Sequence, residues 1–355
     1  MKALIAMSGG VDSSVAAGLM KDAGFECMGC TMKLYNNENA AVPEGKTCCS
    51  LDDIQDARSV ATRLDMPYYV FNFTDDFKEK IIGKFISCYE QAMTPNPCID
   101  CNRYMKFGLL HNRAKELGCD YVVTGHYARI AFEDGKYKLK KSLNPDKDQS
   151  YVLYSVTQDI LAHTKFPLGE LSKAEVRELA SKYEFINAEK PDSQDICFVP
   201  DGDYARVIEE NTGKTYEPGD FVDHDGNVLG THKGLIHYTI GQRKGLGIAA
   251  KAPLYVCELC PSDNTVILGS NDDLFTKEAL VTDVNWISGE SPKEAIHVKA
   301  KVRYRMTEQP VTIIPLENNE VKLVFDEPQR AITPGQAAVF YDGDDVLGGG
   351  VIVRQ

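Results

Sequence analysis

Apolar and polar residues alternate in two different ways along the chain. As far as residue 210, short apolar runs alternate with stretches in which apolar residues recur at helical spacing, as at Ile54, Ala57 and Ala61. The predicted strands are 2–7, 25–32, 67–73 and 121–124, and the predicted helices are 11–24, 51–64, 75–93 and 107–118. Strands that alternate with helices are typical of a parallel sheet covered on both faces, and this predicts an α/β domain.

The pattern changes after residue 210. From 211 to 271 the chain is rich in glycine and short strand patterns, and from 272 to 355 it is almost entirely strand and turn. We therefore expect three domains: an α/β domain at 1–210, a small central domain at 211–271 and a C-terminal β-barrel at 272–355.

The composition is that of an ordinary globular protein, with 43% hydrophobic and 26% charged residues. A formal net charge of −13 argues against a protein that coats nucleic acid non-specifically, although a local basic track is compatible with it. No apolar run is long enough to span a bilayer, and the first strand is too short for a secretory signal. We expect a cytoplasmic protein without a membrane partner.

The segment Ser8-Gly9-Gly10-Val11-Asp12-Ser13-Ser14 links the first predicted strand to the first predicted helix. Glycines let the backbone bring its N–H groups close to an anion, serines add hydroxyl donors, and the helix N-terminus adds a positive partial charge. The absence of a Gly-Lys-Ser/Thr ending separates the segment from the ordinary P-loop. The alternative is a plain strand-to-helix turn capped by serines, but the position of the segment favours a phosphate site.

Eleven cysteines in a protein of the reducing cytosol suggest metal ligands or catalytic thiols where they cluster. Six of them lie in apolar surroundings and are predicted to be small buried residues: Cys27, Cys30, Cys88, Cys119, Cys257 and Cys260. The pairs Cys27/Cys30 and Cys257/Cys260 are predicted poor chelates, because side chains three residues apart on a strand point to opposite faces.

Two prolines lead into Cys98-Ile99-Asp100-Cys101, within a segment (94–102) that is predicted to be a loop exposing both thiols. A third candidate, Cys197, lies in the segment 190–198. These thiols fit a nucleophile with its resolving partner, three ligands of an iron–sulfur cluster, or a zinc site. Zinc would need a fourth ligand, for which the candidates are Cys48, Cys49 and His126.

Basic and apolar residues alternate between 298 and 306. As a single strand, this segment would place four cations on one face, about 6.6 Å apart from neighbour to neighbour and in reach of successive phosphates. They are Lys299, Lys301, Arg303 and Arg305. The alternative is the solvated face of a sheet.

Several motifs in a fixed order give the chain a strong resemblance to a known family. They are residues 6–14, Asn96-Pro97-x-x-x-Cys101-Asn102, Thr124-Gly125-His126-Tyr127-Ala128-Arg129, Asp148-Gln149-Ser150-Tyr151, Asp195-Ile196-Cys197-Phe198 and the segment 238–247. The first resembles the SGGxDSS signature of the PP-loop ATP pyrophosphatases, which cleave ATP between its α and β phosphates. The whole series resembles the MnmA family of tRNA-specific 2-thiouridylases, essentially from end to end.

The resemblance implies a Rossmann-like PP-loop domain of the adenine nucleotide α-hydrolase type. It implies that ATP, with Mg²⁺, adenylates the C2 oxygen of a wobble uridine in tRNA, and that sulfur then replaces this oxygen to give 2-thiouridine, AMP and pyrophosphate. The ATP contacts would be Ala6, Met7, Ser8, Gly9, Gly10, Val11, Asp12, Ser13, Met32 and Gly125. A persulfide on Cys197, loaded by a cysteine desulfurase or a sulfur carrier, would deliver the sulfur. Cys101 would be the nucleophile that assists its release through a transient disulfide.

The same resemblance implies contacts of Asn96, Pro97 and Cys98 with the flipped-out base, and of Asp148, Gln149, Ser150, Arg303, Tyr304 and Arg305 with tRNA. Arg243 and Lys244 are our own further hypothesis for a tRNA contact. Some members carry an aspartate with an acid–base role where this chain has Cys98, so that role is vacant here or falls to Asp100. Cys98, Cys101 and Cys197 also fit a three-cysteine [4Fe–4S] cluster. The sequence does not choose between cluster and persulfide, and we favour the persulfide.

Two other function classes compete with this interpretation. An ATP-dependent amide-forming synthetase of the same superfamily would not need Cys101 or Cys197. A metal-bound tRNA-binding module that uses ATP only as a ligand would release no pyrophosphate when tRNA is added.

Overall fold

The computed structural model describes residues 1–35, 51–191 and 196–354. Its N-terminal sheet has five strands, all parallel, in the order β3-β2-β1-β4-β7. They are β1 (Lys2–Ala6), β2 (Glu26–Lys33), β3 (Tyr68–Asn72), β4 (Tyr121–Val123) and β7 (Thr164–Lys165). The chain runs from β1 outward to β3 on one side and later to β7 on the other. A parallel sheet binds ligands at such a reversal point, beyond the carboxyl end of its central strand.

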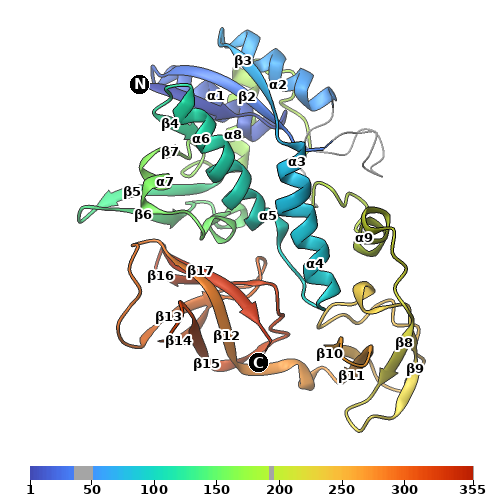
Figure 1. Cartoon of the computed structure of the whole chain (residues 1–355). Helices are drawn as coiled ribbons and strands as arrows, with labels where there is room; N and C mark the ends of the chain where they lie inside the picture. The colour runs from blue at the N-terminus through green and yellow to red at the C-terminus, as the bar shows by residue number, and fades with distance from the viewer. Residues whose placement is uncertain (36–50, 192–195, 355) are drawn as a thin grey trace.

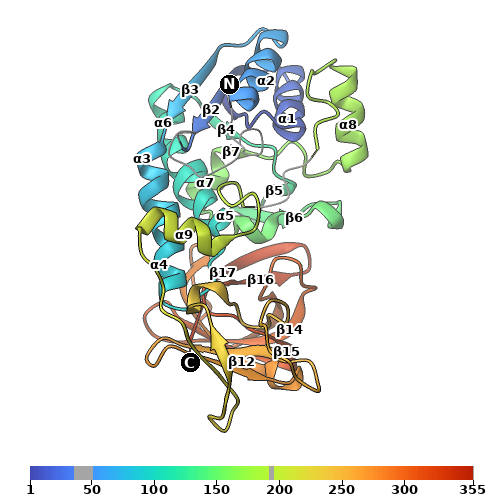
Figure 2. The same cartoon turned by 90° about the vertical axis from the view of Figure 1, so that its right-hand side faces the viewer.

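Helices cover both faces of this sheet, as the alternating pattern predicts. The helices α1 (Val11–Asp22), α2 (Leu51–Arg63) and α8 (Lys173–Lys182) form one buried cluster with the sheet, and they lie together in Figure 2. The opposite face is covered by α3 (Thr74–Phe77) and α6 (Leu110–Glu116), and the same hydrophobic cluster extends away from the sheet through α4 (Lys84–Glu90) and α9 (Tyr204–Thr212). The short helix α7 (Gln158–Ala162) precedes β7. A capping box of Ser172 and Glu175 begins α8, in line with the Ser-x-x-Glu spacing of the sequence.

The prediction of a loop over residues 94–102 is wrong from residue 97 onward. Helix α5 (Pro97–Asp100) begins there and continues through the π-helical segment η2 (Cys101–Leu109) into α6. The Asn96 side chain accepts a hydrogen bond from the Cys98 N–H (3.2 Å), and Pro97 occupies the first helical position. An asparagine cap before a proline is a standard helix start. Cys98 and Cys101 therefore lie one turn apart on a helix.

The central part of the chain forms a four-stranded sheet in the order β10-β11-β8-β9. Its strands are β8 (Gly219–Val222), β9 (Val228–His232), β10 (Tyr255–Cys260) and β11 (Thr265–Gly269). This sheet has its own core around Phe221, Val256 and Leu268. It lies beyond α4, at the opposite end of the molecule from β1 (Figure 1).

The C-terminal strands close into a barrel, as predicted. Their order is β12-β15-β14-β13-β16-β17, and β12 also pairs with β17. They are β12 (Phe275–Trp286), β13 (Ile296–Lys301), β14 (Gln309–Pro315), β15 (Val321–Arg330), β16 (Ala337–Asp342) and β17 (Asp345–Val353). A hairpin from the N-terminal part, β5 (Ala128–Glu133) and β6 (Lys136–Lys141), adds to the edge of β17. The α/β part and the barrel therefore share one hydrogen-bonded sheet (Figure 1).

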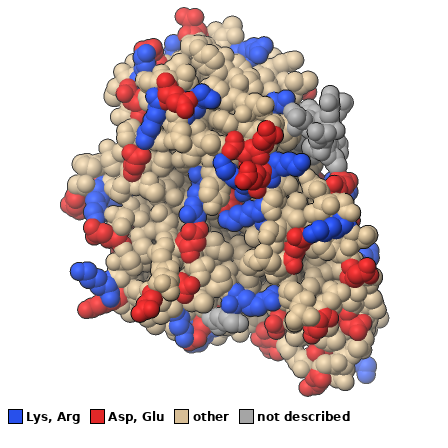
Figure 3. Space-filling model, viewed as in Figure 1, with Lys and Arg blue, Asp and Glu red and all other residues tan. Residues whose placement is uncertain are grey.

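The single basic strand predicted over 298–306 is only half formed. β13 ends at Lys301, and the chain then bends and turns through residues 302–306. The four cations consequently do not share one strand face, and Arg303 turns inward. Figure 3 shows Lys and Arg interspersed with Asp and Glu over the face viewed in Figure 1. Within the described ranges, no helix combines the length and apolarity that crossing a bilayer requires.

Candidate active site

The segment 6–14, here called the PP-loop, crosses the carboxyl end of β1 and enters α1. Gly9 has a φ of +75°, and a Cβ there would lie 2.4 Å from the backbone oxygen of Asp53, so only glycine fits. The Ser13 hydroxyl accepts a hydrogen bond from the Ser8 N–H (3.2 Å) and donates to the Gly10 carbonyl (3.0 Å). The loop is thus held open by its own serines at a helix N-terminus, which is the arrangement that binds phosphate.

Two other residues expected to hold ATP, Gly125 and Met32, lie at the same edge of the sheet, beside Asp12 of the PP-loop. A Cβ on Gly125 would lie 2.8 Å from the Asp12 carbonyl carbon and the Ser13 nitrogen, so this glycine packs directly on the first turn of α1. Met32 is the second-last residue of β2, whose end neighbours the PP-loop. The Asp12 carboxylate accepts hydrogen bonds from Tyr127 (2.8 Å) and Lys173 (2.6 Å).

Two residues that the sequence analysis did not single out brace the PP-loop from behind. The Asn187 side chain donates to the Gly9 carbonyl (2.9 Å) and to the Ser14 hydroxyl (3.0 Å). The Lys190 ammonium contacts the Gly9 carbonyl (3.3 Å), Asp53 (2.6 Å) and Asp56 (2.7 Å). Lys190 lies in the segment that leads to Cys197, so it links the PP-loop to that segment. The position of Lys190 in the segment 190–198 could have indicated its role from sequence, whereas no sequence pattern pointed to Asn187.

A cavity of about 340 Å³ lies between the cysteine-bearing segments. Its lining includes Asn96 and Pro97 at the start of α5, and Ile196, the neighbour of Cys197. The rings of Tyr89 and Tyr204 also line it and stack on each other, with centroids 5.9 Å apart. This volume falls within the range of about 300–1,000 Å³ that is typical of sites for small organic groups. Cys98 is exposed, while Cys101 and Cys197 are half-buried against the hydrophobic cluster of α3, α4 and α6.

All three parts of the molecule hold the segment before α5. The Thr94 N–H donates to the Pro334 carbonyl (2.8 Å), and the Gln336 side chain donates to the Thr94 carbonyl (2.7 Å), both from the barrel. The Thr94 hydroxyl lies 3.3 Å from that of Thr239, which precedes the central sheet's β10. The position of the Cys98 helix therefore depends on the docking of all three parts.

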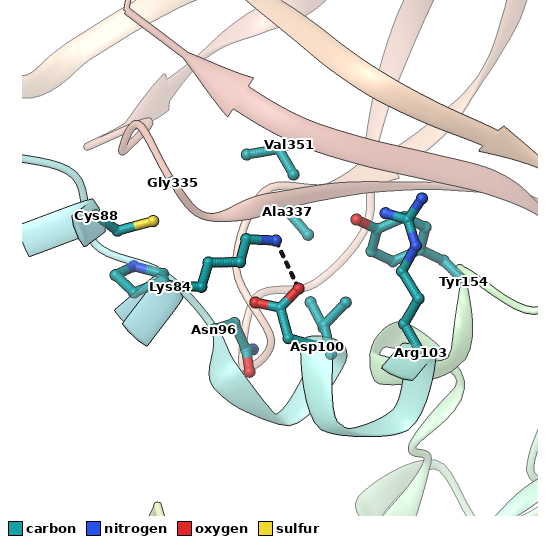
Figure 4. Close-up of a pocket in the computed structure, with 11 residues that line it drawn as sticks. Lys84, Cys88, Asn96, Asp100, Arg103, Tyr154, Gly335, Ala337 and Val351 are labelled. Carbon is teal, nitrogen blue, oxygen red and sulfur yellow. Dashed lines mark hydrogen bonds and ion pairs between the residues drawn. The ribbon is translucent and has the colours of Figure 1, made fainter. Parts of the chain in front are cut away.

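Asp100 lies buried on the other side of α5, where it forms an ion pair with Lys84 (2.6 Å). Figure 4 shows the two side chains pointing toward each other in a small cavity that Arg103, Tyr154 and barrel residues also line. Burial raises the pKa of the Asp100 carboxyl above its ordinary value, although Lys84 opposes this. This geometry favours an anchor between α4 and α5. An acid–base role for Asp100 stays a prediction.

Replacing Lys84 by methionine is expected to lower the free energy of unfolding by about 2 kcal/mol, because Asp100 loses its partner. The loss is smaller than the roughly 3–5 kcal/mol of a fully buried pair, since the Lys84 side chain is 37% exposed. Lys80→Met is a matched control: Lys80 binds Asp76 at 2.6 Å on the preceding turns, but that carboxylate is 37% exposed rather than 11%. The control should lose less than about 1 kcal/mol. Urea unfolding measures both losses, and equal losses of free energy in the two variants would refute an anchoring role of the Lys84–Asp100 pair.

The half-buried Arg303 side chain forms hydrogen bonds within the protein, and its expected tRNA contact stays a prediction. Its guanidinium donates to the carbonyls of Ile240 (3.0 Å) and Ala331 (2.9 Å) and to the Thr333 hydroxyl (2.5 Å). These partners belong to the segment 238–247 and to the barrel. Arg303 therefore ties the two together through one guanidinium nitrogen, Nη2.

Tyr304 and Arg305 stay at the surface next to a second expected tRNA contact. The Tyr304 hydroxyl lies 3.4 Å from the Asp148 carbonyl, and its ring packs against Tyr151. The Asp148 carboxylate accepts from the Ser150 hydroxyl (2.7 Å). Gln149 exchanges hydrogen bonds with the backbone of Tyr127, whose hydroxyl binds Asp12 of the PP-loop. The segment 148–150 therefore connects a surface beside Arg305 to the PP-loop. Arg243 and Lys244 are exposed as well.

The zinc alternative gains no support from the geometry. Among residues 1–35, 51–191 and 196–354, sets of three Cys, His, Asp or Glu donor atoms within 4.8 Å of one another occur only at two other places. Thiolates around one zinc ion must approach about that closely, since each Zn–S bond is about 2.3 Å long. His126 is unsuited as the fourth ligand because Thr124 (2.7 Å) and Lys106 (3.3 Å) engage its ring nitrogens. Cys48, Cys49 and Asp195 lie outside the described residues.

Known protein families and full-length relatives match almost the whole chain. Residues 1–201 match the model of the tRNA methyl transferase HUP domain, 206–270 that of the tRNA methyl transferase PRC-barrel domain, and 276–352 that of the aminomethyltransferase beta-barrel domain. The tRNA-specific 2-thiouridylase MnmA of Acetivibrio thermocellus is 51% identical over 355 residues, covering 99% of each chain. That of Clostridioides difficile is 50% identical, covering 99% of this chain and 98% of its own.

The chain belongs to the tRNA-specific 2-thiouridylase family. The resemblance inferred from its motifs is thereby confirmed. Among solved structures, a 4-thiouridine synthetase–RNA complex with bound ATP shares 18% identity, with a TM-score of 0.38 over 60% of this chain and 53% of that one. A TM-score this low adds nothing to the assignment, which comes from the full-length 2-thiouridylase relatives.

Proposed function

We propose that this protein converts the wobble uridine of tRNA to 2-thiouridine, using ATP to activate the C2 oxygen. The observation that carries the proposal is the full-length similarity to tRNA-specific 2-thiouridylases, about half identical from end to end. The position of the PP-loop at the reversal point of the parallel sheet supports it, because an ATP-dependent step needs such a phosphate site.

In the first step, the C2 oxygen of the uridine attacks the α phosphate of ATP and pyrophosphate leaves. This changes a carbonyl oxygen, which leaves poorly, into part of AMP, which leaves well. The backbone and serines of the PP-loop would hold the phosphates, with Gly125 and Met32 beside them. Mg²⁺, when bound with ATP, neutralises phosphate charge. It prefers oxygen ligands, which the phosphates themselves would supply, because the Lys173 ammonium already binds the Asp12 carboxylate (2.6 Å).

We place the activated base in the 340 Å³ cavity beside Asn96 and Pro97. The exposed ring of Tyr204, stacked on the buried ring of Tyr89, provides flat apolar surface of the kind that stacks with an extruded base. Ile196 brings the chain of Cys197 to the rim of this cavity. The base would therefore lie between the Cys98 helix and the Cys197 segment.

In the second step, a persulfide on Cys197 attacks C2, the C2–O bond breaks and AMP leaves with the oxygen. The Cys101 thiolate then attacks the Cys197 sulfur, which breaks the S–S bond, leaves sulfur on C2 and joins the two cysteines in a disulfide. A thiol reductant restores both cysteines, and a cysteine desulfurase or sulfur carrier reloads Cys197. Cys101 and Cys197 pack against the same hydrophobic cluster, which agrees with this pairing. Coordination of a [4Fe–4S] cluster by Cys98, Cys101 and Cys197 is the alternative.

For tRNA we propose a surface made of Tyr304, Arg305 and the segment 148–150, with Arg243 and Lys244 as a further contact. Arg303 would act indirectly, by fixing the turn that carries its two neighbours. Since the chain carries a net charge of −13, the tRNA affinity should depend on a few such local cations.

Arg305→Glu is expected to weaken tRNA binding by about tenfold at moderate salt, because an exposed cation is lost and an anion takes its place. The slope of log affinity against log salt should fall by about 1. Filter binding at several salt concentrations measures both. Lys293→Glu, an exposed residue outside the family motifs, is the charge-matched control. If both variants bind alike, the surface around Arg305 is not the tRNA site.

Mass spectrometry of nucleosides tests the proposed function. The purified protein is incubated with ATP, a persulfide donor and unmodified tRNA, and the tRNA is then digested. We expect 2-thiouridine at the wobble position, and only with ATP present. Absence of 2-thiouridine from both aerobically purified and anaerobically reconstituted protein would overturn it.

A further inference from the structure

Cys257, predicted to be a small buried apolar residue, is half-buried at an irregularity of β10. In the pairing of β10 with β11, Val256 lies opposite Leu268 and Glu258 opposite Ile267, so Cys257 is an extra residue in the strand. A bulge of this kind re-aims a side chain, and bulges are frequent beside functional sites. The Cys257 thiol points toward residues from two other segments of the central part.

Three potential metal ligands converge there. The donor atoms of His224, Cys257 and Asp273 all lie within 4.8 Å of one another, with His224 Nε2 3.7 Å from Asp273 Oδ2. They surround Gly269: the point where its Cβ would stand is 2.7 Å from His224 Nε2, 2.7 Å from Asp273 Oδ2 and 2.8 Å from Cys257 Sγ. A side chain at this position would press against all three donors, and glycine leaves them room to approach one another.

Local hydrogen bonds fix the segments that bring these ligands. His224 lies in the turn between β8 and β9, where the Asp223 carboxylate accepts from the N–H groups of Asp225 (3.0 Å) and Asn227 (2.8 Å). Asp273 accepts from the N–H (2.7 Å) and hydroxyl (2.8 Å) of Ser270. Partners that orient a ligand in this way are a regular feature of metal sites.

We propose that His224, Cys257 and Asp273 form a binding site for Zn²⁺ or a closely similar divalent transition metal. One sulfur, one nitrogen and one oxygen donor suit zinc, whereas magnesium and calcium do not take a thiolate ligand. Zinc bonds of about 2.0–2.3 Å separate tetrahedral donors by roughly 3.3–3.8 Å, and the 3.7 Å between His224 Nε2 and Asp273 Oδ2 already falls in this range. A water molecule would complete the tetrahedron, because His224 and Asp273 are exposed to solvent.

A metal at this site would cross-link segments at the junction between the central sheet and the barrel. His224 belongs to the β8–β9 hairpin, Cys257 to β10, and Asp273 to the short helical turn just before β12. A metal would cross-link three segments of a sheet that has only a small core of its own. It would also fix the start of β12, and thereby the orientation of the central part relative to the barrel.

The other three-donor set of the described ranges is less suited to a cation. In it, His111 and His163 flank Asp159, but the Lys115 ammonium already binds the Asp159 carboxylate at 3.1 Å. A metal there would have to displace this lysine and tolerate its charge. The Cys257 set has no such competitor among the contacts of the described residues.

The test uses the full chain with Cys98, Cys101 and Cys197 changed to serine, so that the active-site thiols do not contribute. In this background we expect one Co²⁺ per chain, with a thiolate-to-cobalt charge-transfer band, and a rise in melting temperature with Zn²⁺. Cys257→Ser should abolish the band. His224→Ala should weaken Zn²⁺ binding by more than about 100-fold. Gly269→Ala keeps every donor, but its Cβ would lie 2.7–2.8 Å from all three donor atoms and push them apart, so it should also block binding.

Cys260→Ser is the matched control, because it removes a half-buried cysteine of the same strand and should leave the cobalt spectrum unchanged. Failure of the background protein to bind Co²⁺, or a band that survives Cys257→Ser, would overturn the proposal. If Cys257→Ser does not fold, the same Zn²⁺ titration is carried out on His224→Ala, whose substitution lies in an exposed hairpin turn. An unchanged Zn²⁺ affinity of His224→Ala would contradict the proposed site. These readouts do not involve uridine thiolation, so they stand apart from the proposed function.

Discussion

Cys197→Ser is expected to abolish 2-thiouridine formation, with a loss of roughly 10³-fold or more, as when a nucleophile is removed. Serine cannot carry a persulfide, so no sulfur reaches C2. Adenylation uses the PP-loop and not the thiol, so tRNA-dependent release of pyrophosphate should persist for at least one turnover. Parallel assays of 2-thiouridine by mass spectrometry and of pyrophosphate by a coupled enzyme separate the two steps. Loss of both together would place Cys197 in ATP binding instead.

The activity of Cys98→Ser distinguishes the persulfide mechanism from the iron–sulfur cluster mechanism. A persulfide relay between Cys197 and Cys101 leaves Cys98 dispensable for sulfur transfer, and the variant should keep most of its activity. A [4Fe–4S] cluster that uses three cysteines would lose a ligand, and Cys98→Ser would then fail as completely as Cys197→Ser. Cys260→Ser is the control for the loss of a half-buried thiol, since Cys260 lies on β10 and does not line the cavity.

The second large effect is expected from Gly9→Ala in the PP-loop. Alanine at a φ of +75° is strained by about 1–2 kcal/mol, and its Cβ would meet the Asp53 oxygen at 2.4 Å. The loop or α2 must then shift, and a displacement of about 1 Å at a reacting group costs about 10²-fold. We expect a loss of at least that size in tRNA-dependent pyrophosphate release.

Gly24→Ala is the matched control for Gly9→Ala. Gly24 has a φ of +79°, nearly that of Gly9, but nothing lies within 4 Å of a Cβ placed there. The two variants therefore share the backbone strain and differ in the collision. Gly24→Ala should keep near-normal turnover. Equal activity of both variants would mean that the PP-loop does not position ATP.

Much of the fold could be predicted from local sequence patterns, because each of these patterns is compatible with only one arrangement of secondary structure. The alternation of apolar runs with helical periodicity up to residue 210 leads to a parallel sheet with helices on both faces, and this sheet is present. The capping box at Ser172 and the glycine turn after β1 were likewise readable, since backbone hydrogen bonding and steric limits act within a few residues.

The errors lie where tertiary contacts outweigh local pattern. The alternation around Arg303 has the period of a strand, but the guanidinium finds buried carbonyls in segments 63 and 28 residues away, and the chain turns to reach them. Cys257 looked apolar in sequence, because its neighbours His224 and Asp273 come from other segments. The helix start at Asn96-Pro97 was readable, but the two prolines were interpreted as marks of a loop.

The central claim is that ATP activates the C2 oxygen itself, and an oxygen label tests it most directly. An unmodified tRNA anticodon stem-loop is made with ¹⁸O at C2 of the wobble uridine and is turned over with ATP and a persulfide donor. The account predicts one ¹⁸O in the phosphate of the released AMP for each 2-thiouridine formed. Unlabelled AMP alongside 2-thiouridine would contradict adenylation of the C2 oxygen.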